Sequence, residues 1–377
     1  MMPNEKIPYG KQDISEEDVK AVVEVLRSDR LTTGPKVELF EKGLCDYVGA
    51  SHAVAVNSGT SALDIAVGAL ELPPDSEIIT TPFTFAASSN CILYNNCKPV
   101  FADIDPKTYN IDPAQIRKKI TGKTKAIIYV DYAGQPCDIK EIKEIAEEHG
   151  LSLIEDACHA LGAEYGGKRV GSFADMTVFS FHPVKHITTG EGGAVTTENE
   201  ELHHKLKLLR NHGIDKTPGE RTGYAYDMKM LGRNYRITDF QCALGISQLK
   251  RIEGFLSNRG RIAKIYNDEF GKLRELTIPY VKKGVRHAWH LYTILLDKKM
   301  GRDRFFECMK GRGIGVNVHY IPIYRFSYYK RFGIRPEGYP VTEDVYSRTV
   351  TLPLFPKMGD GDAESVISAV KGCLRRL

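Results

Sequence analysis

The first 250 residues alternate short apolar runs with stretches of helical periodicity. Runs rich in β-branched residues predict strands at 53–56, 77–82, 99–104, 126–132, 151–157, 176–181 and 193–197. Between them, helical patterns cover 114–120 and 139–149, and the second ends at Gly150, a residue type favoured at helix C-termini. This alternation predicts an α/β fold with a mainly parallel sheet and helices on both faces. The last two runs have no helix between them, so one antiparallel strand is expected.

The pattern changes after Asp239. Residues 239–270 keep a helical period without interruption and predict one long helix, and the runs at 290–296 and 316–322 then predict strands. The chain ends in an amphipathic helical pattern. We therefore expect a large domain over residues 1–248 and a smaller C-terminal α/β domain over 249–377, bridged by the long helix.

Length and charge narrow the class of protein. The 377 residues fit two domains better than one, and 52 basic against 48 acidic residues give a formal charge of +4 without a long block of one sign. Without such a block, nucleic-acid binding is not expected. Membrane binding is not expected either, because no apolar run approaches the roughly 18 residues of a membrane span. The first 20 residues lack a secretory apolar core, so a cytoplasmic location is expected.

The eight cysteines are spread along the chain without a CxxC pair. This spacing argues against a zinc site and against a disulfide framework. Reduced, mostly buried thiols and no metal site are expected.

A first chemical signal is "NSGTS" at 57–61, which joins a predicted strand to a helical run. Ser58, Gly59 and Thr60 would place backbone N–H groups and hydroxyls at a helix N-terminus, where a phosphate is favoured. The same residues also suit an ordinary helix cap, and both interpretations stay open. The lysine of a Walker phosphate loop is absent.

A second signal is Asp156, which follows the apolar run at 151–155. It would stand at the C-terminal end of a strand, the edge where open parallel sheets bind ligands. A carboxylate there could hold a protonated pyridine nitrogen, and His159 could support it. A helix N-cap is the alternative role for Asp156.

A third signal is Lys185 in "FSFHPVKHITTGEGG", 179–193. A lysine with apolar and polar neighbours can lose its proton and form a Schiff base with an aldehyde. An isolated loop lysine is ordinarily a surface charge. The combination of a phosphate-type turn, an acid at a strand end and Ser180 shortly before the lysine favours chemistry.

Five segments together resemble the DegT–StrS family of pyridoxal-phosphate-dependent nucleotide-sugar aminotransferases: "SGTSAL", "TPFTFAASSN", "DACHALGA", "FSFHPVKHITTGEGG" and "LGRNYRITDFQCALGISQL". The resemblance covers nearly the whole chain. It implies the fold type I of pyridoxal-phosphate enzymes, similar to aspartate aminotransferase, with a seven-stranded sheet in the large domain. It also implies pyridoxal 5'-phosphate as cofactor and L-glutamate as amino donor.

The lysine loop, "HPVKHITT", is most similar to one branch of this family. That branch aminates C4 of a UDP-linked 4-keto-6-deoxy-N-acetyl-altrosamine on the way to pseudaminic acid. The resemblance therefore implies a UDP-linked keto sugar as the amino acceptor. Another UDP- or dTDP-linked 4-keto or 3-keto sugar is the alternative.

The resemblance also assigns roles to residues that bind the cofactor. Lys185 matches the lysine that forms the Schiff base and then acts as acid and base, Asp156 the carboxylate on the pyridine nitrogen, and His159 the imidazole beside the ring. Phe85 matches an aromatic residue that stacks on the cofactor, although a core phenylalanine is the alternative. The matching phosphate ligands are Gly59, Thr60 and Ser180, and Ser58 of the same turn is also expected to bind the cofactor.

Asn234, in "GRNYR", matches a residue that reaches the cofactor phosphate of the neighbouring subunit, which implies a homodimer with shared active sites. Arginines and tyrosines after residue 230 could bind a diphosphate and a flat base by charge-assisted hydrogen bonds and stacking. A basic, aromatic surface is the alternative. The expected substrate-binding residues are Tyr235, Arg236, His319, Tyr320 and His182.

Two residues of the lysine loop have less defined roles. His186 is expected to lie on the solvated surface, and Glu191 resembles a family position near the active site.

Competing functions would need different residues. Dehydratases of the same family carry histidine in place of the Schiff-base lysine, and a non-catalytic regulator would lack Lys185 or Asp156. A nicotinamide-dependent enzyme would need GxGxxG after the first strand, which is absent. The sequence therefore favours an aminotransferase.

Overall fold

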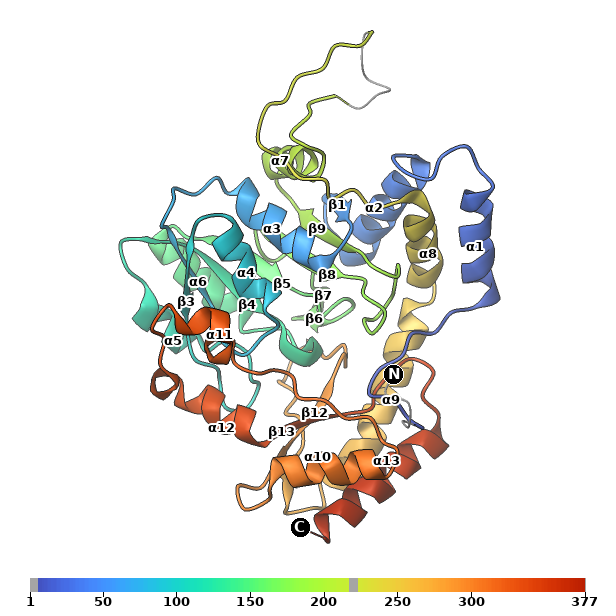
Figure 1. Cartoon of the computed structure of the whole chain (residues 1–377), viewed down its shortest axis with the longest axis vertical. Helices are drawn as coiled ribbons and strands as arrows, with labels where there is room; N and C mark the ends of the chain where they lie inside the picture. Colours follow the sequence, from blue (N-terminus) through green and yellow to red (C-terminus); the bar gives the residue numbers. More distant parts are fainter. Residues whose placement is uncertain (1–5, 217–222, 377) are drawn as a thin grey trace.

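A seven-stranded sheet forms the centre of the larger part of the molecule (Figure 1). The computed structural model describes residues 6–216 and 223–376. The strands are β1 (His52–Val56), β2 (Glu77–Thr80), β3 (Lys98–Phe101), β4 (Thr124–Val130), β5 (Ser152–Asp156), β8 (Met176–Ser180) and β9 (Gly193–Thr197). Their order across the sheet is β1-β9-β8-β5-β4-β2-β3.

All neighbouring pairs from β8 to β3 are parallel, whereas β9 runs antiparallel to both β8 and β1. Val178 of β8 pairs with Val195 of β9. The predicted α/β class, the seven-stranded, mainly parallel sheet and its antiparallel member are confirmed. Parallel strands end at one edge, so β5 and β8 deliver Asp156 and Ser180 to the same side.

Helices cover both faces of this sheet because alternate strand residues point to opposite sides. Val54 and Val56 pack in one apolar cluster, and Ala53 and Ala55 in another. Residues of α3 (Gly59–Ala69), α4 (Ala87–Tyr94) and α7 (Glu200–Arg210) share the first cluster. The second face packs against α2 (Pro35–Val48), α5 (Pro113–Lys119), α6 (Ile139–His149) and α8 (Asp239–Leu249), and α1 (Glu16–Leu26) packs on α8.

The C-terminal part builds its own core around a three-stranded antiparallel sheet of order β10-β12-β13. The elements of this part are α9 (Ile252–Phe270), β10 (Leu276–Thr277), β12 (Tyr292–Leu296), α10 (Arg302–Gly311), β13 (Thr349–Leu352) and α13 (Asp360–Leu374). Ile7, from the start of the chain, packs in the same core. The boundary at residue 248 remains a prediction.

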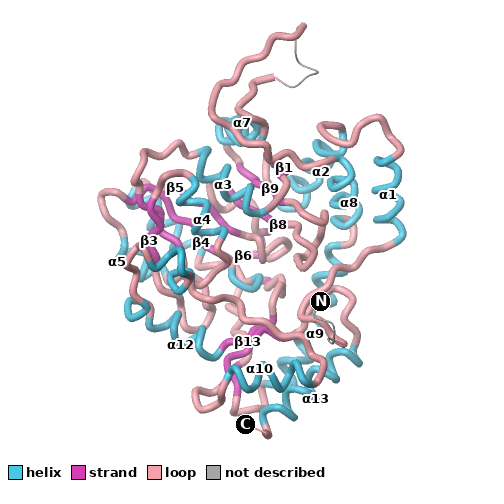
Figure 2. The backbone as a smooth tube through the Cα atoms, in the orientation of Figure 1, coloured by secondary structure: helices cyan, strands magenta, loops and turns pink. Residues whose placement is uncertain are grey.

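Long loops and several short elements join the main helices and strands (Figure 2). A small sheet of order β11-β6-β7 combines β6 (Glu164–Tyr165), β7 (Lys168–Arg169) and β11 (Val285–Arg286). The remaining helices are η1 (Tyr132–Gly134), η3 (Ile323–Arg325), α11 (Ser327–Lys330), η4 (Pro336–Gly338) and α12 (Pro340–Arg348). Within residues 6–216 and 223–376, no helix is long and apolar enough to cross a membrane.

The prediction of one long helix over 239–270 is wrong. The helix breaks between α8 and α9, where the Arg251 N–H bonds to the Gln248 carbonyl three residues back. Side chains at this break bind the N-terminal helix, because Gln248 and Arg251 both donate to Asp18 Oδ2 of α1.

Two further predictions need correction. Residues 316–322 form no strand, since their pairing is limited to a bridge between Asn317 and Thr351. Two of the cysteines are not reduced thiols: α10 and α13 pack with the Cα atoms of Cys308 and Cys373 5.9 Å apart, and the two are disulfide-bonded.

Candidate active site

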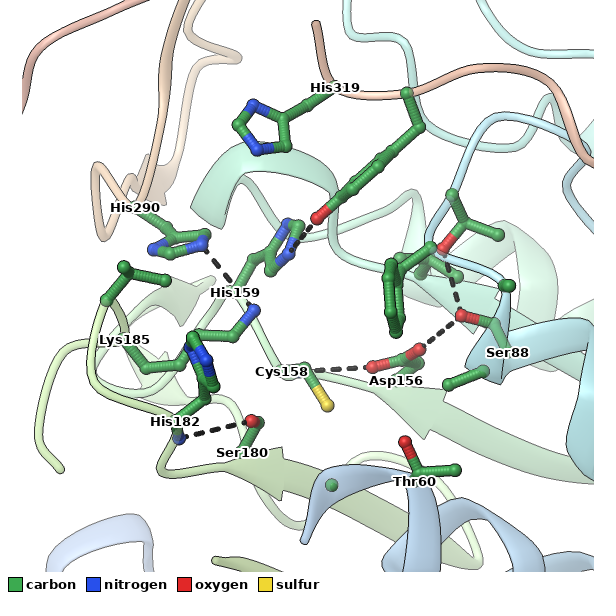
Figure 3. A pocket seen from close by; sticks show the side chains of 18 of the residues that line it. Thr60, Ser88, Asp156, Cys158, His159, Ser180, His182, Lys185, His290 and His319 are labelled. Atoms are coloured by element: carbon green, nitrogen blue, oxygen red, sulfur yellow. Dashed lines mark hydrogen bonds between the residues drawn. The ribbon is translucent and has the colours of Figure 1, made fainter. Parts of the chain in front are cut away.

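A cavity of about 640 Å³ opens at the carboxyl ends of β5 and β8, beside the N-terminus of α3 (Figure 3). Segments of the C-terminal part close its other side, including 317–321. The cavity brings together most of the predicted site. The lining residues include Ser58, Gly59, Thr60, Phe85, Asp156, His159, Ser180, His182, Lys185, His319 and Tyr320.

Asp156, the last residue of β5, is 4% exposed and lies in the cavity wall. Its Oδ2 accepts a hydrogen bond from Ser88 Oγ at 2.7 Å, and its Oδ1 accepts one from the Cys158 backbone N–H at 3.2 Å. These two donors hold the carboxylate in a fixed orientation. No α-helix begins at Asp156, so the cap alternative is excluded and the carboxylate is available to a cationic ligand.

Lys185 lies in the loop between β8 and β9, with its side chain in the cavity (Figure 3). Nζ is 3.5 Å from His290 Nε2. Removal of water around the amine lowers the pKa of Lys185 below 10.5, and the negative charge on Asp156 opposes this only in part. The neutral, nucleophilic amine is therefore populated at lower pH than for a solvated lysine.

The N-terminus of α3 forms the opposite end of the site. Ser58 is the N-cap, and its Oγ accepts from the Ser61 N–H at 3.0 Å. The N–H groups of the first turn have no acceptor within the helix, so an anion is favoured there. A Cβ at Gly59 would lie 2.9 Å from Ser180 Cβ, so only glycine lets the helix approach the end of β8 this closely. The capping and phosphate interpretations are thus compatible.

Aromatic rings line the cavity as well. Phe85 is 58% exposed, so the prediction that it faces the site is favoured over a core position. His159 is buried, and burial lowers its pKa well below 6.5, so the ring is neutral. Its Nδ1 accepts from the Ala133 N–H at 3.3 Å, which leaves the proton on Nε2, 3.0 Å from the Tyr320 hydroxyl oxygen.

Three predicted residues do not line the cavity of their own chain. Asn234 is exposed and forms a bridge with Asn211. The Tyr235 hydroxyl donates to Asp64 Oδ2 at 2.9 Å, and Arg236 donates to Asn211 Oδ1 at 2.7 Å. Their roles in binding remain predictions.

The predicted surface position of His186 is wrong. The ring is 1% exposed, and its Nε2 donates to the Ala288 carbonyl at 3.1 Å. This hydrogen bond connects the lysine loop to the segment before β12 and keeps the His186 ring inside the protein.

Sequence reasoning missed several groups of the site. Ser88 and Cys158 orient Asp156, and His290 contacts Lys185. Ser88 lies in "TPFTFAASSN" and Cys158 in "DACHALGA", so their place in these family-like segments was a signal that could have identified them. His290 lies 105 residues from Lys185 and had no such signal.

The donor set fits pyridoxal phosphate. A hydrogen-bonded carboxylate suits its pyridinium nitrogen, a lysine with a lowered pKa suits its aldehyde, and a helix N-terminus with the hydroxyls of Thr60 and Ser180 suits its phosphate. Phe85 offers an exposed aromatic ring for its flat face. This fold and this site define a pyridoxal-phosphate-dependent transferase.

The family follows from comparison with known proteins. The model of the DegT/DnrJ/EryC1/StrS aminotransferase family matches residues 12–371, and the chain belongs to this family. It is 40% identical over 378 residues to the UDP-4-amino-4,6-dideoxy-N-acetyl-beta-L-altrosamine transaminase of Campylobacter jejuni (strain 81-176), covering 98% of each chain. It is also 40% identical over 381 residues to the spore coat polysaccharide biosynthesis protein SpsC of Bacillus subtilis, covering 99% of this chain and 98% of SpsC.

Solved structures agree with this assignment. PseC of Helicobacter pylori, an aminotransferase involved in the biosynthesis of pseudoaminic acid, is similar with a TM-score of 0.94 and 37% identity, over 98% of this chain and 100% of PseC. Spr1654 of Streptococcus pneumoniae, solved in its PLP form, is similar with a TM-score of 0.93 and 31% identity, over 98% of this chain and 99% of that one. The protein is a pyridoxal-phosphate-dependent aminotransferase.

Proposed function

We propose that the protein transfers the amino group of L-glutamate to C4 of a UDP-linked 4-keto-6-deoxy-N-acetylhexosamine of the altro configuration. The similarity to the C. jejuni transaminase over 98% of both chains carries this proposal. The cavity supports it, because Lys185 and Asp156 both line it.

Lys185 is assigned two tasks by this proposal. Its Nζ would hold the cofactor covalently and, as the free amine, would move a proton between the donor's amino-bearing carbon and C4′ of the cofactor. When bound, pyridoxal phosphate supplies an electron sink that stabilises negative charge on that carbon. The lowered pKa of Lys185 suits both tasks, since a neutral amine is needed for each.

Other residues would bind and orient. Asp156 would hold the proton on the pyridine nitrogen by charge, and the Ser88 hydroxyl and Cys158 N–H would keep its carboxylate aimed at the cavity. The first turn of α3, with Thr60 and Ser180, would bind the phosphate. The substrate would meet His182, His319 and Tyr320 on the remaining wall.

A homodimer with shared sites is part of the proposal. The connection between α7 and α8 extends away from the rest of the chain in its described parts (Figure 1). Apolar side chains in it are exposed, among them Tyr224 at 94% and Leu231 at 78%. Burial of these groups against a second copy would be favourable and would bring Asn234 toward the partner's phosphate site.

A substrate panel tests the proposal. The purified protein is supplied with glutamate and UDP- or dTDP-linked 4-keto sugars, and products are identified by mass and NMR. We expect the highest kcat/KM for the UDP-linked altro epimer. A preference for the gluco epimer or for dTDP sugars would contradict the substrate assignment. It would favour a second candidate, a different sugar for polysaccharide synthesis, which the similarity to SpsC suggests.

A further inference from the structure

Arg259 of α9 is 0% exposed, and no carboxylate lies within ion-pair distance of it in the part of the chain that the structure describes. An unpaired buried charge is costly unless hydrogen bonds compensate it. The guanidinium instead donates to backbone carbonyls: Nη1 to Leu354 at 2.9 Å, His290 at 3.2 Å and Trp289 at 3.3 Å, and Nη2 to Val184 at 3.4 Å. A cation built into the interior at this cost needs a reason.

These carbonyls belong to three segments that meet beside the active-site lysine. Val184 directly precedes Lys185, and His290 carries the imidazole that lies 3.5 Å from Lys185 Nζ. Leu354 follows β13 of the C-terminal part. Arg259 therefore fixes the backbone on both sides of the contact between lysine and imidazole, and ties that contact to the C-terminal core.

We propose that Arg259 is a positioning residue for Lys185 and holds the lysine loop against the His290 segment. As a buried cation without a counter-charge, Arg259 also disfavours protonation of Lys185 Nζ. This inference rests on the proposed role of Lys185. It adds a residue outside the cavity lining to the machinery that sets the reactivity of the lysine.

The charges around Lys185 are consistent with this role. Burial lowers the pKa of Arg259 to about 9, which still leaves it charged at neutral pH. Burial also keeps the neighbouring imidazoles of His159, His186 and His290 neutral by lowering their pKa well below 6.5. Asp156 favours the lysine cation, and Arg259 opposes it. The other titratable groups that line the cavity with the lysine are Tyr9, Cys158, His182, Glu191, His319 and Tyr320.

The test separates charge from geometry in the holoenzyme. Arg259→Gln removes the charge, whereas Arg259→Lys keeps the charge but has fewer hydrogen-bond donors. Arg261→Gln is the matched control on the same helix, because Arg261 is exposed and pairs with Asp360. The readouts are the pH midpoint of the visible band of the bound cofactor and kcat. We expect Arg259→Gln to raise the midpoint by on the order of one pH unit. Arg259→Lys should leave the midpoint in place and lower kcat about tenfold, and Arg261→Gln should change neither.

A parental midpoint in cofactor-loaded Arg259→Gln would overturn the proposal, as would an equal shift in Arg261→Gln. If Arg259→Gln does not fold, Arg259→Lys decides: an unchanged midpoint with lowered kcat supports the role, and a displaced midpoint or parental kcat overturns it. Failure of the proposed role of Lys185 is distinguishable, because borohydride would then not attach the cofactor of the parent enzyme to Lys185, and failure of the substrate assignment would appear only in the sugar panel.

Discussion

At the scale of single residues, Lys185 carries the strongest expectation. Its Nζ is proposed both to hold the cofactor and to move the proton, so Lys185→Ala should lower kcat by about 10³-fold or more. Borohydride reduction of the parent protein should attach the cofactor to the peptide that contains Lys185, which mass spectrometry can map. Attachment to another lysine would contradict the assignment. Lys168 is exposed, so Lys168→Ala is a control for the loss of a lysine.

Asp156→Asn tests the other half of the site. An amide cannot stabilise the pyridinium charge, so turnover should fall by about 10²-fold or more while the cofactor stays bound through the lysine and the phosphate site. Single-turnover absorbance with glutamate measures the chemistry, and equilibrium dialysis measures retention. Ser88→Ala removes one donor to the same carboxylate and should cause a smaller loss. Parental turnover in Asp156→Asn would refute the role.

The sequence revealed these residues because each lies in a short contiguous motif. The residues adjacent in sequence were enough to identify Lys185, Asp156 and the turn at 58–60. The structure places all of them around one cavity. Arg259 and His290 had no such context, since their contacts with the lysine segment span 75 and 105 residues. His186 was misplaced because a histidine beside a loop lysine gives no sign of burial, which depends on the Ala288 carbonyl.

At the scale of elements, β5 places two carboxylates on opposite faces of the sheet. Asp156 faces the cavity, whereas its neighbour Glu155 is fully buried and accepts from Thr177 Oγ1 at 2.8 Å. Burial raises the pKa of Glu155 to about 7. A folded-state pKa above the unfolded value means that the contribution of this group to stability is complete below about pH 4.5 and is lost as the pH rises through 7.

Glu155→Gln should therefore flatten the pH dependence of stability. Relative to the parent protein, its free energy of unfolding should gain about 1–3 kcal/mol between pH 5 and pH 8. Denaturant unfolding at both pH values measures the difference. Glu147→Gln, on the exposed face of α6, is the control and should follow the parent. An unchanged pH dependence in Glu155→Gln would show that Glu155 ionises freely in the fold.

The strands could be predicted because short β-branched runs bounded by turn residues are typical of strands. The break at Lys250 and Arg251 could not, because both helices continue one apolar period and the side chains at the break bind a distant carboxylate, Asp18. Residues 316–322 have the composition of a strand. In the structure they instead form part of the cavity wall, which His319 and Tyr320 line. Local propensity gave way to tertiary contacts in both cases.

At the scale of the whole molecule, one predicted phosphate contact lies outside the cavity of its own chain. Residues 58–60 and Ser180 form the proposed phosphate end, while Asn234, predicted to reach a phosphate, is exposed and outside the cavity of its own chain. In the proposed homodimer, a second copy would supply Asn234, which follows the extended connection between α7 and α8 (Figure 2). The expected homodimer then has two sites, each with a lysine from one protomer and an asparagine from its partner.

Mixing two inactive variants tests this arrangement. Lys185→Ala and Asn234→Asp each disable both sites of their own homodimer, the second by placing a negative charge beside the phosphate. In a mixed dimer, shared sites would gather both lesions in one site and leave the other site intact. Co-expression with two different affinity tags isolates mixed dimers, whose activity should approach half that of the parent. If each site instead uses its own Asn234, every site of a mixed dimer carries one lesion, and proven mixed dimers without recovered activity would establish that outcome.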